Sequence, residues 1–197
     1  MATSPNRADN PQPNTTAVVL LASILAIAVL LLRLEGRLWW CACGRWNLWS
    51  GNVWSQHNSQ HLFDPYSFTH VLHGMVACGL LAYFLPRLAL QWRLCIAVLA
   101  EATWEVVENT EFVINRYRGA NIMFDYHGDT VANSLGDIIS FAVGFWLARR
   151  IGLRCSIIVF IVTEIVLLIC IRDNLLLSAA MLIYPAEVVK SWQLGPK

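Results

Sequence analysis

The stretch from Asp129 to Leu147, DTVANSLGDIISFAVGFWL, decides the fold class of this chain. It is apolar enough for a membrane-spanning helix, yet Asp129, Asn133 and Asp137 recur at steps of four residues and so follow one helix face. A carboxylate two turns inside a span is costly in contact with lipid, and such groups normally face the interior of a bundle. The stretch therefore predicts a polar pocket within an apolar helix bundle.

The composition agrees with a membrane protein. The sequence of 197 residues is 57% hydrophobic and only 14% charged, with a mean hydropathy of +0.52. At about 20 residues per span, this length allows five or six helices and no separate soluble domain. The formal net charge of +1 and the lack of a basic run argue against a nucleic-acid partner. The fold class expected is all-α, a polytopic transmembrane helix bundle.

Hydropathy along the chain predicts five spans and one shorter element. A polar tail at 1–16 precedes a single integral membrane domain at 17–193, and residues 194–197 form a second tail. The sixth apolar piece, 175–184, reaches only about half the hydrocarbon core, which predicts an interfacial or re-entrant helix unless 173–192 continues as one span. The five predicted spans are 17–34, 68–84, 94–114, 130–147 and 156–171.

Four of these segments carry polar groups near one end. When the spans are threaded through a bilayer, those ends fall on the same side, which predicts that the groups share one pocket. The groups are His70 and His73; Glu105, Glu108 and Asn109; Asp129, Asn133 and Asp137; and Arg172, Asp173 and Asn174.

The residue types indicate what the pocket can do. His70 and His73 lie three residues apart on one helix face, which suits a shared metal ion, a carboxylate or a phosphate. The plainer alternative is that these imidazoles bind a helix carbonyl or face headgroups. Glu101, Glu105 and Glu108 form a stripe that must be paired, protonated, coordinated or exposed to a water-filled cavity.

Candidate roles follow from these types. A divalent metal would be bound by His70, His73, Asp129 and Asp137, and Arg172 would bind a phosphate through its forked guanidinium. Asp129 has an alternative role as a helix N-cap, whereas Asp137 is too deep for that and is expected to pair with Arg172 or the histidines. The catalytic candidates are His70, His73, Glu105, Glu108 and Asp137, and the substrate-binding candidates are Arg172, Asn109, Asn133, Asp173 and Asn174.

The loop at 35–67 is rich in tryptophan, which indicates a position at the headgroup level and a cap over the pocket. It also holds Cys41, Cys43, His57 and His61. The C-x-C spacing is closer than the C-x-x-C of an ordinary zinc half-site, so no zinc finger is predicted. Near the spans, Lys and Arg are equal in number on the two sides, and only the cluster Arg149, Arg150 and Arg154 favours a cytoplasmic N-terminus.

The polar segments are also recognisable as a set. They resemble a family of uncharacterised multi-pass inner-membrane proteins of alphaproteobacteria, known only as a domain of unknown function, over about residues 33–193. This resemblance implies a location in the cell inner membrane and a topology class, and no reaction. The polar positions on their own are more distantly similar to VanZ-like membrane proteins. The segments are RLWWCACGRWNLWSG (37–51), SQHNSQHLFDPYSFTHVLHG (55–74), WEVVENTEFVINRYR (104–118), DYHGDTVANSLGDIISFAVGFWLARR (125–150) and IRDNLLLSAAMLIYPAEVVKSWQ (171–193).

Two functions of different classes remain open. One is a membrane enzyme on a lipid-linked or phosphorylated small molecule, using a divalent metal or acid and base groups. The other is a non-catalytic transporter, ion- or proton-binding protein or assembly protein. Five helices without an internal repeat argue against a transporter, unless an oligomer supplies the pathway. The sequence holds no G-x-S-x-G, Walker or H-E-x-x-H motif to decide between them.

Overall fold

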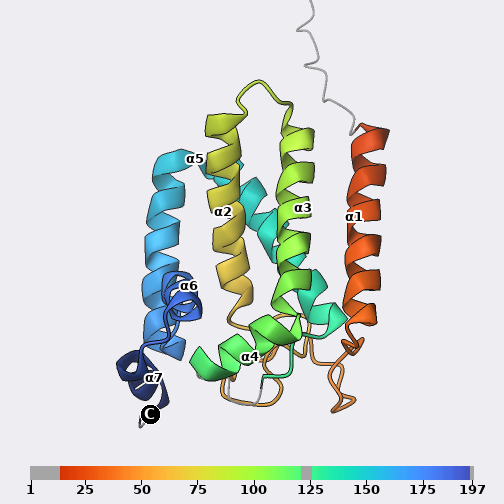
Figure 1. Cartoon of the computed structure of the whole chain (residues 1–197). Coiled ribbons are helices and arrows are strands. Elements are labelled where there is room, and N and C mark those ends of the chain that lie inside the picture. Colours follow the sequence, from red (N-terminus) through yellow and green to blue (C-terminus); the bar gives the residue numbers. More distant parts are fainter. Residues whose placement is uncertain (1–13, 121–125, 196–197) are drawn as a thin grey trace, which may run out of the picture.

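The computed structural model describes residues 14–120 and 126–195, and within them the regular structure is entirely helical. The all-α prediction is confirmed, since the strand-like contact in this part of the chain is a single bridge between Trp49 and Phe63. Figure 1 shows α1, α2, α3 and α5 side by side, with the short helices gathered at one end. The helices are α1 (Thr15–Leu34), α2 (Ser67–Phe84), α3 (Leu90–Glu108), α4 (Glu111–Ala120), α5 (Val131–Ile171), α6 (Leu175–Ile183) and α7 (Glu187–Leu194).

Three helices, α1, α2 and α5, are long and apolar enough to cross a membrane. Their outward faces carry large apolar side chains, as at Leu30 and Ile169, which are 58% and 75% exposed. Such faces are unfavourable in water and suit contact with lipid. The predicted tail at 1–16 lies mostly outside the described residues, and Thr15 and Thr16 already belong to α1.

α5 is 41 residues long and contains a reversal at Gly152. This residue has φ +75° and ψ 171°, a conformation that only glycine adopts readily. The chain doubles back there, so the second half of α5 returns toward the end of the molecule where α6 and α7 lie (Figure 1). The halves contain the two predicted segments 130–147 and 156–171, with Arg149, Arg150 and Arg154 around the reversal.

The predicted third segment, 94–114, is wrong at both ends. α3 begins at Leu90 and stops at Glu108, and α4 is a separate helix from Glu111. The break lies where the side chain of Asn109 bonds away from the helix, its Oδ1 accepting from the backbone N–H of Asp129 at 2.7 Å. Thr110 precedes α4, and its Oγ1 accepts from the N–H of Val113 in the first turn of that helix at 3.4 Å.

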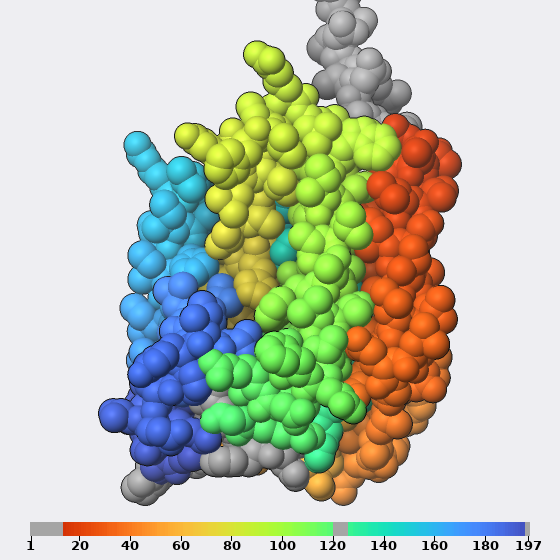
Figure 2. Space-filling model, viewed as in Figure 1, coloured from red at the N-terminus to blue at the C-terminus, as the bar shows by residue number. Residues whose placement is uncertain are grey.

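The predicted short sixth element, 175–184, is confirmed as α6, whereas the alternative of one continuous helix over 173–192 is wrong. α6 ends before Pro185, whose ring cannot continue a helix, and α7 follows. Arg116 of α4 donates to the carbonyl oxygens of Leu182 and Ile183, each at 2.7 Å, which fastens α4 to the end of α6. Figure 2 shows α4 and α6 in contact across this end of the molecule.

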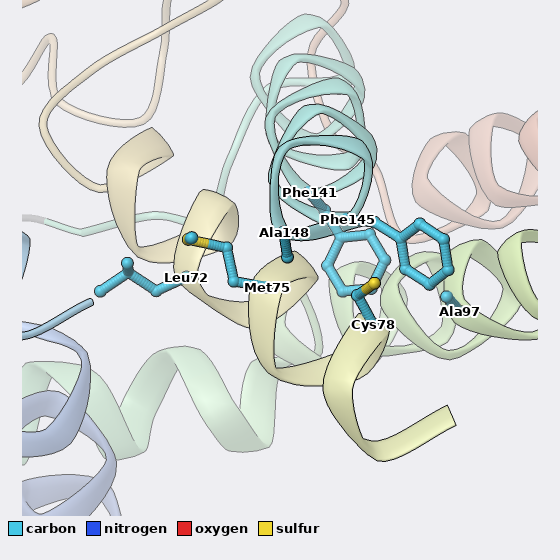
Figure 3. Close-up of a cluster of buried hydrophobic side chains, with 7 residues drawn as sticks. All are labelled: Leu72, Met75, Cys78, Ala97, Phe141, Phe145 and Ala148. Carbon is cyan, nitrogen blue, oxygen red and sulfur yellow. The ribbon is translucent and has the colours of Figure 1, made fainter. Parts of the chain in front are cut away.

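α2 and the first half of α5 cross at backbone contact. A Cβ added at Gly74 would lie 1.9 Å from the carbonyl oxygen of Phe141, and one at Gly144 would lie 2.0 Å from that of Val71. Small residues permit this approach, as they do in membrane helix pairs generally. The contact continues into the buried cluster of Figure 3, formed by Leu72, Met75, Cys78, Ala97, Phe141, Phe145 and Ala148.

We expect Gly144→Ala to lower the free energy of unfolding by about 1–3 kcal/mol, because its methyl group would force apart two backbones. The matched control is Gly79→Ala in α2, where an added Cβ meets nothing within 4 Å. That change should stabilise the helix by about 0.5–1 kcal/mol. Helicity monitored against temperature in detergent measures both, and equal effects at the two positions would contradict the close crossing.

Candidate functional site

A cavity of about 230 Å³ lies at the end of the bundle where the short helices gather. Polar groups of the lining come from α2, α3 and α5, and α6 contributes Leu175, Ala179 and Leu182 together with Ser178. Within the described chain, its lining contains no Lys or Arg side chain. The titratable groups of the lining are Tyr66, His70, His73, Glu108, Tyr117, Tyr126, Asp129 and Asp137.

His70 is the centre of the site. The ring is buried, and its Nδ1 lies 2.6 Å from Oε1 of Glu101 and 3.4 Å from Oε1 of Glu105. On the opposite side, its Nε2 is 3.9 Å from Oδ2 of Asp137. Carboxylates from α3 and α5 therefore flank one imidazole of α2, which is the convergence that the helical spacing predicts.

His73 joins the same group one turn further along α2. Its Nδ1 is 3.5 Å from Oε1 of Glu101, and its ring centroid is 5.2 Å from that of His70. The side chain of His73 is 28% exposed, against 8% for His70. His73 is therefore the imidazole closer to the outside of the bundle.

Two triplets have donor atoms close enough to bind one metal ion. In His70, His73 and Glu101, and again in His70, Glu105 and Glu108, one donor atom per residue lies within 4.8 Å of the others. Imidazole nitrogens and carboxylate oxygens together suit first-row divalent ions. The predicted ligands Asp129 and Asp137 belong to neither triplet, and Glu101 takes a place that the sequence-based candidates did not include.

Asp137 has one of its expected partners, His70, but not Arg172. The hydroxyl of Ser67 donates to its Oδ1 at 2.7 Å, and His70 lies on the side of Oδ2. Arg172 is turned away, because its Nη1 donates to the carbonyl oxygens of Trp192 and Gly195 at 3.3 and 2.7 Å. The expected pairing of Asp137 with Arg172 is therefore wrong, and Arg172 does not line the cavity.

Asp129 is held in place by its neighbours rather than acting as a helix cap. The N-cap of α5 is Thr130, whose Oγ1 accepts from the N–H of Asn133 at 3.2 Å. Tyr126 donates to Oδ1 of Asp129 at 2.9 Å, and Asn109 donates to Oδ2 at 3.1 Å. Burial raises the pKa of Asp129 from 3.8 to about 6, against the opposing effect of the Tyr126 hydrogen bond.

The remaining candidates fasten α6 over the cavity. Tyr66 and Ser178 donate to Oδ2 of Asp173 at 3.1 and 2.8 Å, and burial raises the pKa of Asp173 to about 6. Asn174 is the N-cap of α6, since its Oδ1 accepts from the N–H of Leu177 at 2.8 Å. Glu164 also receives the first N–H groups of α6, those of Leu175 and Leu176, at 2.9 and 3.1 Å.

Two buried side chains on the helices that line the cavity have unused hydrogen-bonding capacity. Asn133 is 1% exposed, and neither its side-chain oxygen nor its nitrogen has a hydrogen-bond partner. Glu105 is 0% exposed, and neither carboxylate oxygen takes part in a hydrogen bond. Unsatisfied buried polar groups are rare in native proteins and often mark a bound water, ion or ligand.

Sequence reasoning missed the aromatic part of the lining. Trp104, Tyr117 and Tyr126 come from three segments, and no periodic pattern connects them. A weak signal existed for Trp104, which lies between Glu101 and Glu108 on the acidic stripe of α3.

These helices and this site define a class: a helical protein with segments apolar enough to enter a membrane and a buried pocket of histidine and carboxylate groups near one end. The chain belongs to the family described as a protein of unknown function, DUF2585, whose model matches residues 32–195. The predicted membership of an uncharacterised alphaproteobacterial family is confirmed, and the more distant similarity to VanZ-like proteins stays a prediction.

Relatives named UPF0314 protein support this assignment over most of the chain. The relative from Sinorhizobium fredii is 43% identical, covering 95% of this chain and 96% of its own length. The relative from Rhizobium meliloti is 45% identical over 87% of each chain, and that from Paracoccus denitrificans is 42% identical over 86% of this chain and 88% of its own. No solved structure matches the chain.

The raised pKa of Asp129 has a measurable consequence for stability. The native state binds the proton of the Asp129 carboxyl group more tightly than the unfolded state does. The contribution of this proton to the free energy of unfolding is therefore fully present below pH 3.8 and is lost as the pH rises through about 6. The Asp129→Asn variant should therefore unfold at a higher temperature than the parent protein at pH 7.5, by an amount equivalent to at most about 3 kcal/mol.

This advantage should shrink as the pH falls toward 4.5. Thermal unfolding in detergent across this range measures it, with Glu111→Gln as the control because Glu111 is exposed. A variant less stable than its parent at every pH would mean that the Asp129 carboxylate is stabilised in its ionised form.

Proposed function

We propose that this protein is a multi-pass enzyme of the inner membrane that uses a divalent metal ion to act on a lipid-linked or phosphorylated substrate. The proposal includes five spans, α1, α2, α3 and the two halves of α5, with the N-terminus in the cytoplasm. For α3, the supporting observation is its two-sided character: Glu101 and Glu105 are buried, whereas Ile96 and Leu99 are 42% and 52% exposed. A span of this kind presents apolar residues to lipid and polar residues to the bundle.

One observation carries the proposal: several carboxylates surround His70, whereas no basic side chain lines the described cavity. Glu101, Glu105 and Asp137 all approach His70, and no Lys or Arg side chain lines the described cavity. A phosphate entering such a site would be repelled unless a cation were bound there. The triplet His70, His73 and Glu101 has the donor types and the spacing to hold that cation.

The chemistry of the residues then divides into separate roles. A divalent ion at the triplet would neutralise phosphate charge and lower the pKa of a bound water. Glu105 is next to the triplet, 3.4 Å from the His70 nitrogen, with both oxygens free of hydrogen bonds. It can accept a proton from that water as a general base. Asp137 and Ser67 would fix the orientation of His70 from the other side.

The apolar wall indicates the substrate class. Leu175, Ala179 and Leu182 of α6 all line the cavity and lie on one face of that helix. They face a polar wall made by α2, α3 and α5. A molecule with a charged head and a hydrocarbon chain matches both walls, which supports a lipid-linked substrate over a small soluble one.

A second function, the binding of a cation or proton without catalysis, is favoured by one observation. Glu105 is fully buried and its nearest polar partner is an imidazole nitrogen, so a proton or ion at this carboxylate would relieve an unsatisfied charge. Coupled proton and ion sites in membrane proteins have this character. Activity measurements distinguish the two functions.

Metal content tests the site first. The protein purified in detergent should retain a divalent ion that the double variant His70→Ala, His73→Ala loses, and Glu101→Gln should weaken binding at least about tenfold. Glu111→Gln is the matched control, because this exposed carboxylate lies outside both triplets. Equal metal content in all four proteins would remove the basis for the metal site.

Turnover tests the enzyme. Inorganic phosphate release from phosphatidic acid or a long-chain lipid diphosphate in mixed micelles should require added Mn²⁺, Mg²⁺ or Zn²⁺. Glu105→Gln should lower the rate about 10²–10⁴-fold, the usual contribution of a general base, with metal content unchanged. Metal binding without turnover on either substrate would favour the cation-binding function instead.

A further inference from the structure

A second group of metal-binding side chains lies outside the cavity, in the segment between α1 and α2. Cys41, Cys43, His57 and His61 each offer one donor atom, and these four atoms lie within 4.8 Å of one another. Cys41 Sγ is 3.4 Å from Nδ1 of His57, and Cys43 Sγ is 4.0 Å from Nε2 of His61. Cys41 and His57 are 16 residues apart along the chain, and Cys43 and His61 are 18 residues apart.

We propose that these four residues form a structural zinc site that fixes this segment beside the cavity. Structural zinc sites are four-coordinate and tetrahedral, and two cysteines with two histidines are a common ligand set. With bond lengths of about 2.3 Å to sulfur and about 2.0–2.1 Å to nitrogen, a tetrahedron places its donor atoms about 3.3–3.8 Å apart. Of the two sulfur-to-nitrogen distances, 3.4 Å lies inside that range and 4.0 Å lies just above it.

The backbone around the ligands is arranged for this purpose. The N–H of Cys43 donates to Cys41 Sγ at 3.5 Å, a contact that favours the thiolate a metal needs. Gly44 closes the turn with φ +70°, and its N–H donates to the carbonyl of Cys41 at 3.1 Å. This turn is what lets a C-x-C pair direct both sulfur atoms to one point, so the spacing that argued against zinc in the sequence is compatible with it in three dimensions.

The histidine side of the site is strained and tied to the cavity. Ser59, between the two histidines, has φ +59°, which is unusual for a residue other than glycine. Its carbonyl oxygen accepts from the N–H of Thr130 at 3.1 Å, and Ser59 lines the cavity. The neighbouring Gln60 donates to the carbonyl of Gly128 at 2.8 Å. A metal at this point would hold the segment against the start of α5.

Regular secondary structure contributes little to holding the shape of this segment. From Glu35 to Tyr66 it contains no helix and, apart from one bridge, no strand pairing among its residues, all of which are described. A long connection of this kind inside a compact domain is normally functional or specially fastened. Cys41 and Cys43 are free thiols, so a disulfide does not supply the fastening.

Elemental analysis of the full chain in detergent tests this site separately from the cavity. The measurement uses the His70→Ala, His73→Ala background, which removes the proposed cavity ion. One equivalent of zinc should remain there, and it should fall to zero when Cys41→Ser and Cys43→Ser, or His61→Ala alone, are added. Cysteine substitutions at Cys155 and Cys170, both exposed and distant in sequence, are the matched controls and should leave zinc unchanged.

Thiol reactivity of the unaltered protein keeps the test independent of whether the variants fold. Zinc should protect Cys41 and Cys43 from alkylation, and a chelator should expose both, as read by mass spectrometry of the 37–51 region. Equal labelling with and without the chelator, or no zinc after supplementation during growth, would overturn the proposal. A Cys41–Cys43 disulfide in the purified protein would overturn it as well. If the unaltered protein held this zinc and no second ion at the cavity, only the function proposed for the cavity would be refuted.

Discussion

The close crossing of α2 and the first half of α5 is the contact on which the rest of the molecule depends. The crossing needs residues without side chains at Gly74 and Gly144, because the facing carbonyl oxygens occupy the space of a Cβ. Two helices at this distance bring Ser67 and His70 within reach of Asp137. The same packing that stabilises the bundle therefore sets the geometry of the polar site, and α3 completes it from the side with its acidic stripe.

The second constraint is electrostatic. Several carboxylates are buried close together near His70, and the repulsion among them would destabilise the bundle unless protons or a cation offset it. Tyr126 and Asn109 supply hydrogen bonds at Asp129, and Tyr66 and Ser178 supply them at Asp173. Glu105 has no such support. The carboxylates at the edges of the site thus have hydrogen-bond partners, whereas Glu105 near its centre has none. This pattern is expected of a ligand-binding site.

Helical periodicity was sufficient to predict the centre of the site. His70, Glu105 and Asp137 lie on regular helices, so their steps of three or four residues fix which face they occupy, and hydropathy fixes which end of each helix they lie near. The orientation of Arg172 could not be found in this way. Its backbone has φ +55°, a local turn after α5 that directs the side chain toward α7.

Tertiary contacts set the other features that the sequence did not disclose. The end of α3 depends on hydrogen bonds between Asn109 and Asp129, which are 20 residues apart. The meeting of Cys41 with His57 depends on the path of a segment without periodicity, where no pattern indicates which side chains face each other. Spacing rules describe ligands on one element, and they do not extend to ligands that a folded loop brings together.

The position of α6 has a consequence for the order in which this protein matures. The apolar wall of the cavity belongs to a helix that the ribosome makes after every other element of the lining. The carboxylates of α3 and α5 must therefore pack together while the pocket is still open on one side. Asp173 and Glu164 then receive α6 through hydrogen bonds to Ser178 and to the first N–H groups of that helix. During synthesis there is an interval in which water and ions reach the site freely, and the docking of α6 ends it.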